Sequence, residues 1–242
     1  MKKTTVLIPA RMASSRFPGK PLALINGLPM IVCCAKNAIK TGLEVIVCTD
    51  SKDIKSACSL YNITSILTPE FDTGTDRLAH VVKSLDTENI INLQGDEPLI
   101  SSSSINLIAQ KLNSLKPESE EIINGISFLN PNLVSDPNIV KCAFIEKYAK
   151  IQYFSRSPLL NTSDQKSNLQ YIKQLGLYGM SKKNLIDFSS LPQGKLEKAE
   201  KVELLRWIEN NKLVKGCMIF EKTLSVDTPQ DLLDVLDMIN PK

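Results

Sequence analysis

Apolar residues in the first half of the chain form short runs, and each run is followed by a longer stretch with helical periodicity. The runs at residues 4–9, 44–49 and 89–94 are rich in Val, Ile and Leu, as buried strands are. The expected helices cover residues 30–41, 52–60, 75–85 and 101–115. Strands that alternate with helices predict an α/β fold, with a doubly wound, mostly parallel sheet.

In the second half of the chain, strand-like segments and turns replace the alternation of strands and helices. Strand-like segments are expected at residues 122–129, 139–145, 149–155 and 169–180. Asn-Pro, Asp-Pro and Asn-Thr-Ser-Asp clusters separate them, and such clusters are typical of turns. The pattern predicts a mixed or antiparallel elaboration of the sheet.

The last part of the chain returns to an alternating pattern. A helix is expected at residues 196–210, a strand at 212–220 and a final helix from Pro229 to Ile239. Proline suits the first position of a helix because its missing N–H has no partner there. We find no internal repeat or linker, so residues 1–242 are predicted to form one domain.

Composition and charge narrow the class of protein. Hydrophobic residues make up 43% and charged residues 23%, which is typical of a soluble globular protein. The net charge is only +3 and the basic residues are not clustered, so nucleic-acid binding is not expected. Pro9 and Arg11 interrupt the first apolar run before the core of a signal peptide could form. We therefore expect a cytoplasmic protein without a membrane segment.

The cysteines and the single histidine exclude several chemistries. The six cysteines form no C-x-x-C pair and mostly lie in apolar runs, so buried free thiols are expected. His80 lies off the apolar face of the helix expected at residues 75–85, which predicts a surface position. A zinc site, a Ser-His-Asp triad and a Cys-His pair are all disfavoured by this inventory.

The loop after the first strand carries the first candidate chemistry, because ligands bind at the carboxyl ends of parallel strands. Residues 10–20 contain Arg11, Arg16 and Lys20 together with two serines and a glycine. Such a loop can surround a polyphosphate with backbone N–H groups and cations. It matches neither the P-loop nor the G-x-G-x-x-G pattern, so an ordinary solvated basic loop remains an alternative on spacing alone.

Acidic residues follow a second strand end. Gly95 permits a sharp turn after the strand at residues 89–94, and Asp96 and Glu97 then lie beside the basic loop. Two neighbouring carboxylates favour a cation, and Mg²⁺ binds a few carboxylate oxygens together with waters and phosphates. Asp227 occupies a comparable position before the final helix, although a plain helix cap would also explain it in isolation.

Seven sequence motifs follow one another along the chain and together span nearly its whole length. They lie at residues 6–22, 73–79, 94–98, 153–157, 175–179, 196–200 and 226–232. Together they closely resemble the 3-deoxy-manno-octulosonate cytidylyltransferase family, the CMP-Kdo synthetases. The resemblance implies a sugar-nucleotidyltransferase fold, Mg²⁺-dependent use of CTP, and a homodimer with contacts and sugar binding at about residues 130–190.

The resemblance also implies roles for single residues. The positions that match nucleotide contacts are Ala10, Arg11, Ser14, Lys20, Thr75, Arg77 and Gln94. Those that match the sugar pocket are Gln94, Arg156, Gln174, Tyr178 and Glu203, with Glu203 expected on the helix at residues 196–210. Asp96 and Asp227 match the carboxylates that hold the catalytic metal, and with Arg11 and Lys20 they are the predicted catalytic residues.

Four positions depart from the family pattern. Phe71 and Gln174 replace usual histidines, Leu204 replaces a usual glutamine, and Met180 replaces a usual aromatic residue. We expect Gln174 and Leu204 to lie near the sugar pocket. Loss of an amide there would change how a hydroxyl-rich sugar is recognised.

The predicted reaction transfers CMP from CTP to the anomeric hydroxyl of 3-deoxy-D-manno-octulosonate (Kdo), for lipopolysaccharide biosynthesis. A modified Kdo such as the 8-amino sugar, or another acidic sugar such as a nonulosonate, remains an alternative. A non-catalytic regulator that binds a sugar nucleotide is an alternative of a different class. Fold alone would also allow a glycosyltransferase.

Overall fold

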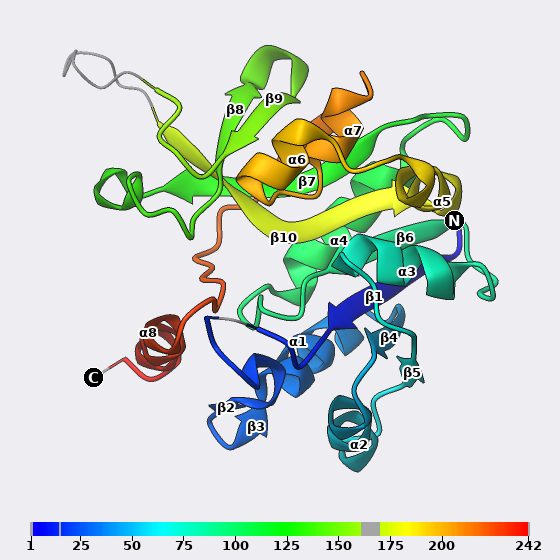
Figure 1. Cartoon of the computed structure of the whole chain (residues 1–242), viewed down its shortest axis with the longest axis vertical. Coiled ribbons are helices and arrows are strands. Elements are labelled where there is room, and N and C mark those ends of the chain that lie inside the picture. Colours follow the sequence, from blue (N-terminus) through cyan, green and yellow to red (C-terminus); the bar gives the residue numbers. More distant parts are fainter. Residues whose placement is uncertain (1, 15, 161–169, 242) are drawn as a thin grey trace.

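The computed structural model describes residues 2–14, 16–160 and 170–241. The strands of the main sheet are β1 (Thr4–Ala10), β4 (Glu44–Thr49), β5 (Ser65–Leu67), β6 (Asn89–Leu93), β7 (Ile122–Leu129), β8 (Lys141–Ile145), β9 (Lys150–Ser155), β10 (Tyr171–Ser181) and β11 (Val214–Met218). In the described residues they are ordered β5-β4-β1-β6-β10-β7-β11-β9-β8 (Figure 1). A separate hairpin pairs β2 (Leu24–Ile25) with β3 (Leu28–Pro29).

The first half forms the parallel part of the sheet. Strand β1 pairs in parallel with β4 and β6, and β4 pairs in parallel with β5. Within β1, Val6 and Ile8 enter the core on one face and Leu7 enters the core on the other. Both faces are apolar because both are covered, as parallel sheets require. The predicted doubly wound arrangement is confirmed.

The second half adds the mixed elaboration that the turn pattern predicts. Strand β10 runs antiparallel to both β6 and β7, while β11 runs parallel to β7. Strands β8 and β9 form an antiparallel pair at the edge. Because β10 is hydrogen-bonded to β6, the elaboration is continuous with the parallel half.

Helices cover the two faces. They are α1 (Met30–Ile39), α2 (Lys52–Leu60), α3 (Gly74–Val82), α4 (Ser102–Asn113), α5 (Lys182–Ser190), α6 (Lys195–Glu200), α7 (Leu205–Glu209) and α8 (Pro229–Ile239). Residues of α1, α2, α4 and α8 enter the core on one face, and residues of α3, α5 and α7 enter the core on the other. Figure 1 shows α8 close to the loop after β1 and far from the N-terminus.

The prediction of one continuous helix at residues 196–210 is wrong, because this segment forms two helices, α6 and α7. Lys201 ends α6 in the left-handed region at φ 53°. Arg206 donates to both carboxylate oxygens of Glu197, at 2.8 and 2.7 Å. In a continuous helix these residues would be separated by about 13 Å along the axis, which excludes the pair. Glu203 therefore lies in the break and not on a helix.

Other elements have weak signals in the sequence. Strand β5 has three residues, and α5 follows directly on the long strand β10, capped by Ser181. Neither was predicted. The first residue of the predicted strand 169–180 lies outside the described residues, and the described strand begins at Tyr171.

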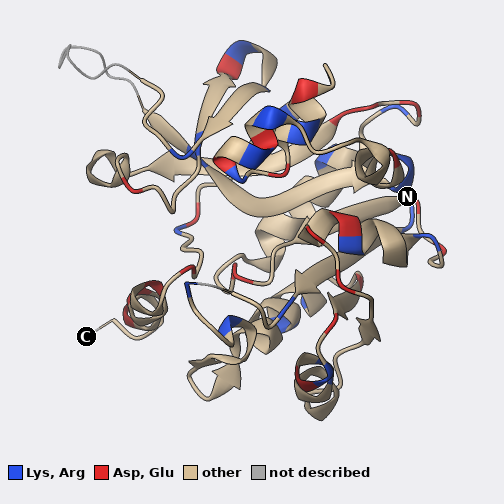
Figure 2. Ribbon diagram, viewed as in Figure 1, with Lys and Arg blue, Asp and Glu red and all other residues tan. Residues whose placement is uncertain are grey.

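The inventory of surface and buried residues follows expectation. His80 is exposed, and five cysteines are buried free thiols while Cys33 is half-buried. Basic and acidic segments are interspersed along the chain (Figure 2). None of the helices in the described ranges has both the length and the apolar character needed to cross a bilayer.

Candidate active site

Two adjoining cavities lie at the carboxyl ends of β1 and β6. The small cavity, of about 300 Å³, is lined by the loop after β1, the start of α3 and the segment after β6. The wide cavity, of about 820 Å³, is lined by the ends of β7 and β10 and by the segment before α8. Residues common to both are Arg16, Gln94, Asp96, Glu203 and Asp227. A ligand in one cavity can therefore reach a ligand in the other beside the two aspartates.

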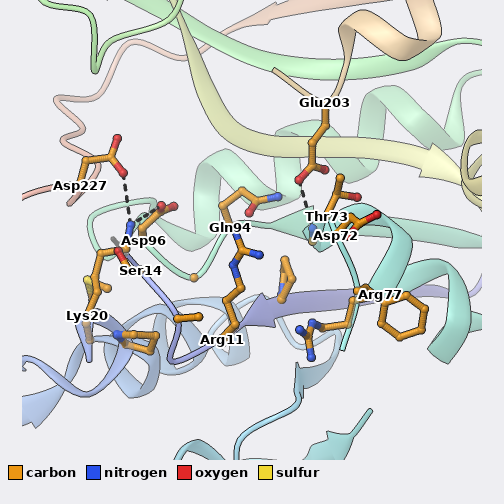
Figure 3. Close-up of a pocket in the computed structure, with 18 of the residues that line it drawn as sticks. Arg11, Ser14, Lys20, Asp72, Thr73, Arg77, Gln94, Asp96, Glu203 and Asp227 are labelled. Atoms are coloured by element: carbon orange, nitrogen blue, oxygen red, sulfur yellow. Dashed lines mark hydrogen bonds and ion pairs between the residues drawn. The ribbon is translucent and has the colours of Figure 1, made fainter. Parts of the chain in front are cut away.

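Lys20 joins the two aspartates (Figure 3). Its Nζ lies 2.8 Å from Asp96 Oδ2, 3.3 Å from Asp227 Oδ1 and 2.7 Å from the carbonyl oxygen of Val226. Arg16 approaches the same Asp227 oxygen at 2.9 Å. Two carboxylates far apart in the sequence thus meet at one ammonium group.

Burial and charge act in opposite directions on Lys20. Burial alone would lower the pKa of its ammonium, but the charges of Asp96 and Asp227, and hydrogen bonds to both, raise that pKa above its ordinary value. Lys20 therefore remains protonated between the two carboxylates.

The local backbone explains how Lys20 reaches this position. Gly19 has φ 72°, a left-handed conformation that costs glycine little, and it leads into a 3₁₀ turn at Lys20–Leu22. Gly95 makes the approach of β6 to β1 possible, because a Cβ there would lie 2.9 Å from the carbonyl oxygen of Pro9. The Val226 amide also donates to the Asp96 carbonyl at 2.9 Å, which fixes the segment before α8 beside the loop after β6.

Asp227 is not the cap of α8. Thr228 is the N-cap and accepts from the Asp231 amide, while the Asp231 carboxylate accepts from the amides of Thr228 and Asp227. This capping box satisfies the start of the helix. The simple-cap interpretation of Asp227 is therefore wrong, and its side chain faces Lys20 and Arg16.

Glu203 holds the start of α3. Its two carboxylate oxygens accept from the amides of Gly74 and Thr75, at 3.1 and 3.2 Å, and from the Thr75 hydroxyl. Burial raises the pKa of Glu203, and the hydrogen bonds from Thr75 and Gly74 oppose this rise. Thr75 itself is fully buried and lines neither cavity, so its predicted direct contact with the nucleotide is not what the structure shows.

The remaining residues predicted to contact the nucleotide line the small cavity: Ala10, Arg11, Ser14, Lys20, Arg77 and Gln94. Figure 3 shows Arg11 and Gln94 between the Lys20 end and the Arg77 end. Arg77 is nearly fully buried and is bound to Asp50 and Thr68 within the protein. Its guanidinium supports the cavity wall, whereas Arg11 and Arg16 are exposed cations that line the same cavity.

All the residues predicted for the sugar line the wide cavity: Gln94, Arg156, Gln174, Tyr178 and Glu203. Arg156 is held by the carbonyl oxygens of Glu200 and Pro137, at 2.8 and 2.9 Å. The Gln174 Nε2 is a buried donor without a partner among the described residues. An oriented cation and an unpaired amide suit a ligand that carries a carboxylate and hydroxyl groups.

Glu97 and Lys173 also line the wide cavity, and neither was predicted to be a catalytic, metal-binding or sugar-binding residue. Glu97 accepts from the Gly176 amide at 2.7 Å, and its second oxygen has no partner in the part of the chain that the structure describes. Burial, followed by the charge of Asp96, raises the pKa of Glu97 to about 7. Lys173 lines the same cavity and donates to the Thr223 carbonyl oxygen at 2.7 Å. The position of Glu97 just after a strand end could have indicated a functional role, whereas nothing in the local sequence pattern indicates one for Lys173.

The four departures from the family pattern have different surroundings. Gln174 lines the wide cavity as expected, and Phe71 lines the small one. Leu204 and Met180 are fully buried in the core on the α3 face and line neither cavity. Leu204 directly follows Glu203, which lines the wide cavity, but its own side chain does not face a ligand there. An apolar residue at 204 packs there with the core.

The family is decided by the sequence as a whole. The sequence model of the cytidylyltransferase family matches residues 5–216. The chain belongs to the cytidylyltransferase family. This cytidylyltransferase is 38% identical over 234 residues to the 8-amino-3,8-dideoxy-manno-octulosonate cytidylyltransferase of Shewanella sp. (strain ANA-3), covering 94% of this chain and 95% of that one. It is 35% identical over 231 residues to the 3-deoxy-manno-octulosonate cytidylyltransferase of Chlorobium limicola, covering 94% and 93%.

Solved structures give the same result for the fold of this cytidylyltransferase. A CMP:2-keto-3-deoxy-manno-octonic acid synthetase complexed with CTP superposes with a TM-score of 0.89 at 31% identity, covering 98% of both chains. A glucose-1-phosphate thymidylyltransferase from Bacillus anthracis superposes with a TM-score of 0.68 at 13% identity, covering 99% of this chain and 96% of that one. At that identity the second likeness concerns the fold alone.

Proposed function

We propose that this cytidylyltransferase transfers CMP from CTP to the anomeric hydroxyl of 3-deoxy-D-manno-octulosonate and releases pyrophosphate. The observation that carries the proposal is the pair of cavities that share Asp96 and Asp227. A nucleotide in the small cavity and a sugar in the wide cavity would meet beside these carboxylates.

The chain's own residues would position both substrates. Arg11, Lys20 and Arg16 line the small cavity and would bind the triphosphate oxygens. Arg156 supplies a positive charge in the wide cavity for the sugar carboxylate, and the unpaired Gln174 Nε2 would donate to a sugar oxygen. Holding both reactants in place converts a bimolecular encounter into a local one, which is a large part of phosphoryl-transfer catalysis.

The reaction forms a bond from the sugar hydroxyl oxygen to the α-phosphorus and breaks the bond from that phosphorus to the bridging oxygen of pyrophosphate. The electron pair of the broken bond leaves with pyrophosphate, and the hydroxyl proton passes to solvent. Arg11 and Lys20 would stabilise the charge that develops on the leaving group. Each such contact contributes about 10²-fold in comparable sites.

Asp96 and Asp227 would hold the Mg²⁺ ion of the reaction. The fit is supported by the Lys20 ammonium, a stand-in cation that these carboxylates and the Val226 carbonyl already surround with oxygen. Oxygen donors of this kind suit Mg²⁺. When bound, the ion would neutralise phosphate charge and lower the pKa of a hydroxyl group.

The 8-amino sugar is a second candidate substrate. Relatives with 38% identity carry that activity in their names, whereas the relative from Chlorobium limicola at 35% is named for the unmodified sugar. Glu97, with one unpaired oxygen in the wide cavity, offers a carboxylate that an ammonium group could use.

A homodimer formed by the elaboration at about residues 130–190 is part of the proposal. Leu133 and Tyr148 in this segment are exposed apolar side chains, at 43% and 58% exposure. Sedimentation analysis should give twice the mass of one chain, and a monomer at micromolar concentration would contradict this part.

A sugar panel tests the function. The protein is incubated with CTP, Mg²⁺ and either Kdo, its 8-amino form or a nonulosonate, and pyrophosphate release is measured. We expect release with an octulosonate, and the ratio of kcat/KM values identifies the preferred sugar. Release with the nonulosonate alone would reassign the substrate. Binding of CTP without release for any sugar would favour a regulator.

A further inference from the structure

The Lys20 ammonium occupies the place between the two carboxylates. It is held by three oxygens, one each from Asp96, Asp227 and the Val226 backbone, at 2.8, 3.3 and 2.7 Å. The Lys20 side chain is only 13% exposed, and that of Asp227 only 17%. The group is thus a partly buried cation site that a side chain of the protein already fills.

Arg16 adds a second protein cation to the same cluster. It binds Asp227 Oδ1, the oxygen that Lys20 also contacts, and it binds the Asn138 side chain across the wide cavity. One oxygen of each carboxylate is therefore engaged by a cation of the loop after β1. A divalent ion that approached the remaining oxygens would be repelled by the nearby ammonium.

The same lysine faces the small cavity. Lys20 and Arg16 both line it, together with Arg11 and Gln94. Phosphate oxygens in this cavity would attract both cations through charge-assisted hydrogen bonds. A ligand that draws Lys20 toward its phosphates would leave Asp96 and Asp227 as two carboxylates without their ammonium.

We propose that Lys20 closes the metal site in the free protein, and that the phosphates of the nucleotide open it by taking over the Lys20 ammonium. Metal and nucleotide then bind cooperatively, each favouring the other by the same factor. The proposal rests on the proposed function in taking the small cavity as the site of the nucleotide phosphates, and Asp96 and Asp227 as the metal site.

Metal binding without nucleotide tests the first step directly. Mn²⁺ alone is the probe, and free Mn²⁺ is measured by electron paramagnetic resonance in titrations of wild type, Lys20→Met and Arg11→Met. We expect weak binding by wild type and a gain of about tenfold for Lys20→Met, in the usual range of coupling between two sites.

Arg11→Met is the matched control. It removes one positive charge from the same loop and cavity, but Arg11 is not within ion-pair distance of either aspartate. It should bind Mn²⁺ like wild type. Lys20→Met/Asp227→Asn should lose the gain. Equal affinities for wild type and Lys20→Met, an equal gain in Arg11→Met, or a gain that survives in the double variant would each overturn the proposal.

A second measurement uses the wild-type protein and is independent of how the variants fold. Acetylation of lysines by acetic anhydride is followed by mass spectrometry at increasing Mn²⁺, without nucleotide. Labelling of Lys20 should rise with the same midpoint as Mn²⁺ binding, while labelling of the exposed Lys183 stays constant. If Mn²⁺ binds and the labelling of Lys20 is unchanged, the ion and the ammonium occupy different places and the proposal fails.

These outcomes are separate from the test of the proposed function. Neither experiment uses CTP or sugar, so the results depend only on Lys20 and the two aspartates. A protein that fails to release pyrophosphate with every sugar can still pass them, and an active enzyme can still fail them.

Discussion

The role of Asp227 depends on its immediate neighbours. In the sequence it precedes Thr228 and Pro229, a context typical of a helix start. Thr228 and Asp231 form the cap between themselves, which leaves the Asp227 carboxylate for Lys20 and Arg16. The sequence pattern could locate the helix start, but it could not decide which of two adjacent polar residues caps it.

Asp227→Asn should separate activity from stability. It keeps the size of the side chain and removes the charge that faces Lys20, while the cap at Thr228 is retained. We expect kcat to fall about 10²-fold or more, as when other preorganised charges are removed. Pyrophosphate release and thermal unfolding measure the two effects.

Asp231→Asn is the control for this variant. It weakens the capping box and should lower the free energy of unfolding by about 1 kcal/mol, with kcat of the folded protein near that of wild type. Wild-type turnover by Asp227→Asn would contradict the assignment of this carboxylate.

Gly176 offers a test of the wide cavity. A Cβ at this position would lie 2.8 Å from Gln94 Cβ and 2.9 Å from Glu97 Cγ. Gly176→Ala should therefore displace both side chains and raise the KM for the sugar about tenfold or more, because misplacement by about 1 Å costs that much or more. Steady-state kinetics with the sugar as the varied substrate provide the measurement.

Gly125→Ala is its matched control. Its Cβ would meet Leu177 at 3.5 Å, an ordinary contact in the neighbouring strand. Its KM for the sugar should stay close to that of wild type. If the two variants raise this KM equally, the effect is a general one on the sheet and not one on the cavity.

At the scale of elements, buried strands were the most predictable features and the α6–α7 region the least. Strands β1, β4 and β6 have apolar side chains on both faces, so a short apolar run identifies them. The break between α6 and α7 depends on Arg206, which pairs with Glu197 and also with Asp76 of α3 at 2.8 Å. Helical periodicity carries no information about a partner so distant in the chain.

This ion-pair group positions Glu203. Arg206 is 2% exposed, and its ion pairs join α7 to α6 and α3. Its guanidinium carbon lies 4.6 Å from the centre of the Phe188 ring of α5. Because α3 and α7 are tied together, the Glu203 carboxylate meets the first amides of α3. The ion pairs of Arg206 therefore position Glu203, which lines both cavities, although Arg206 itself lines neither.

Arg206→Met should be strongly destabilising. It leaves the buried carboxylate of Glu197 and that of Asp76 without their cation, a change that costs about 3–5 kcal/mol in comparable buried pairs. Urea unfolding measures the loss. The double variant Arg206→Met/Glu197→Gln should recover part of the lost free energy of unfolding, because it removes one of the two unpaired charges.

Lys183→Met is the comparison at the surface. Lys183 pairs with Asp187 on an exposed face of α5, and exposed pairs contribute little. Its unfolding curve should overlie that of wild type. An Arg206→Met curve that also overlies wild type would show that the ion-pair group does not hold α6 and α7.

At the scale of the whole molecule, the sequence indicated which strand ends carry chemistry, and the sheet order explains why those ends meet. Strands β1 and β6 are neighbours, so the loop after β1 and the segment after β6 share one edge. Strand β10 continues the sheet next to β6 and brings Gln174 and Tyr178 to the same edge. The order of β10, β7 and β11 could not be derived from the pattern, because antiparallel and parallel pairings alternate there.

The most direct test of the account follows the phosphorus atoms of CTP. Phosphorus NMR of the protein with CTP, Mg²⁺ and Kdo, or its 8-amino form, should show CMP-sugar and pyrophosphate appearing in equal amounts and only when the sugar is present. Formation of CDP and phosphate, release of CMP without a sugar adduct, or no change with either octulosonate would contradict it.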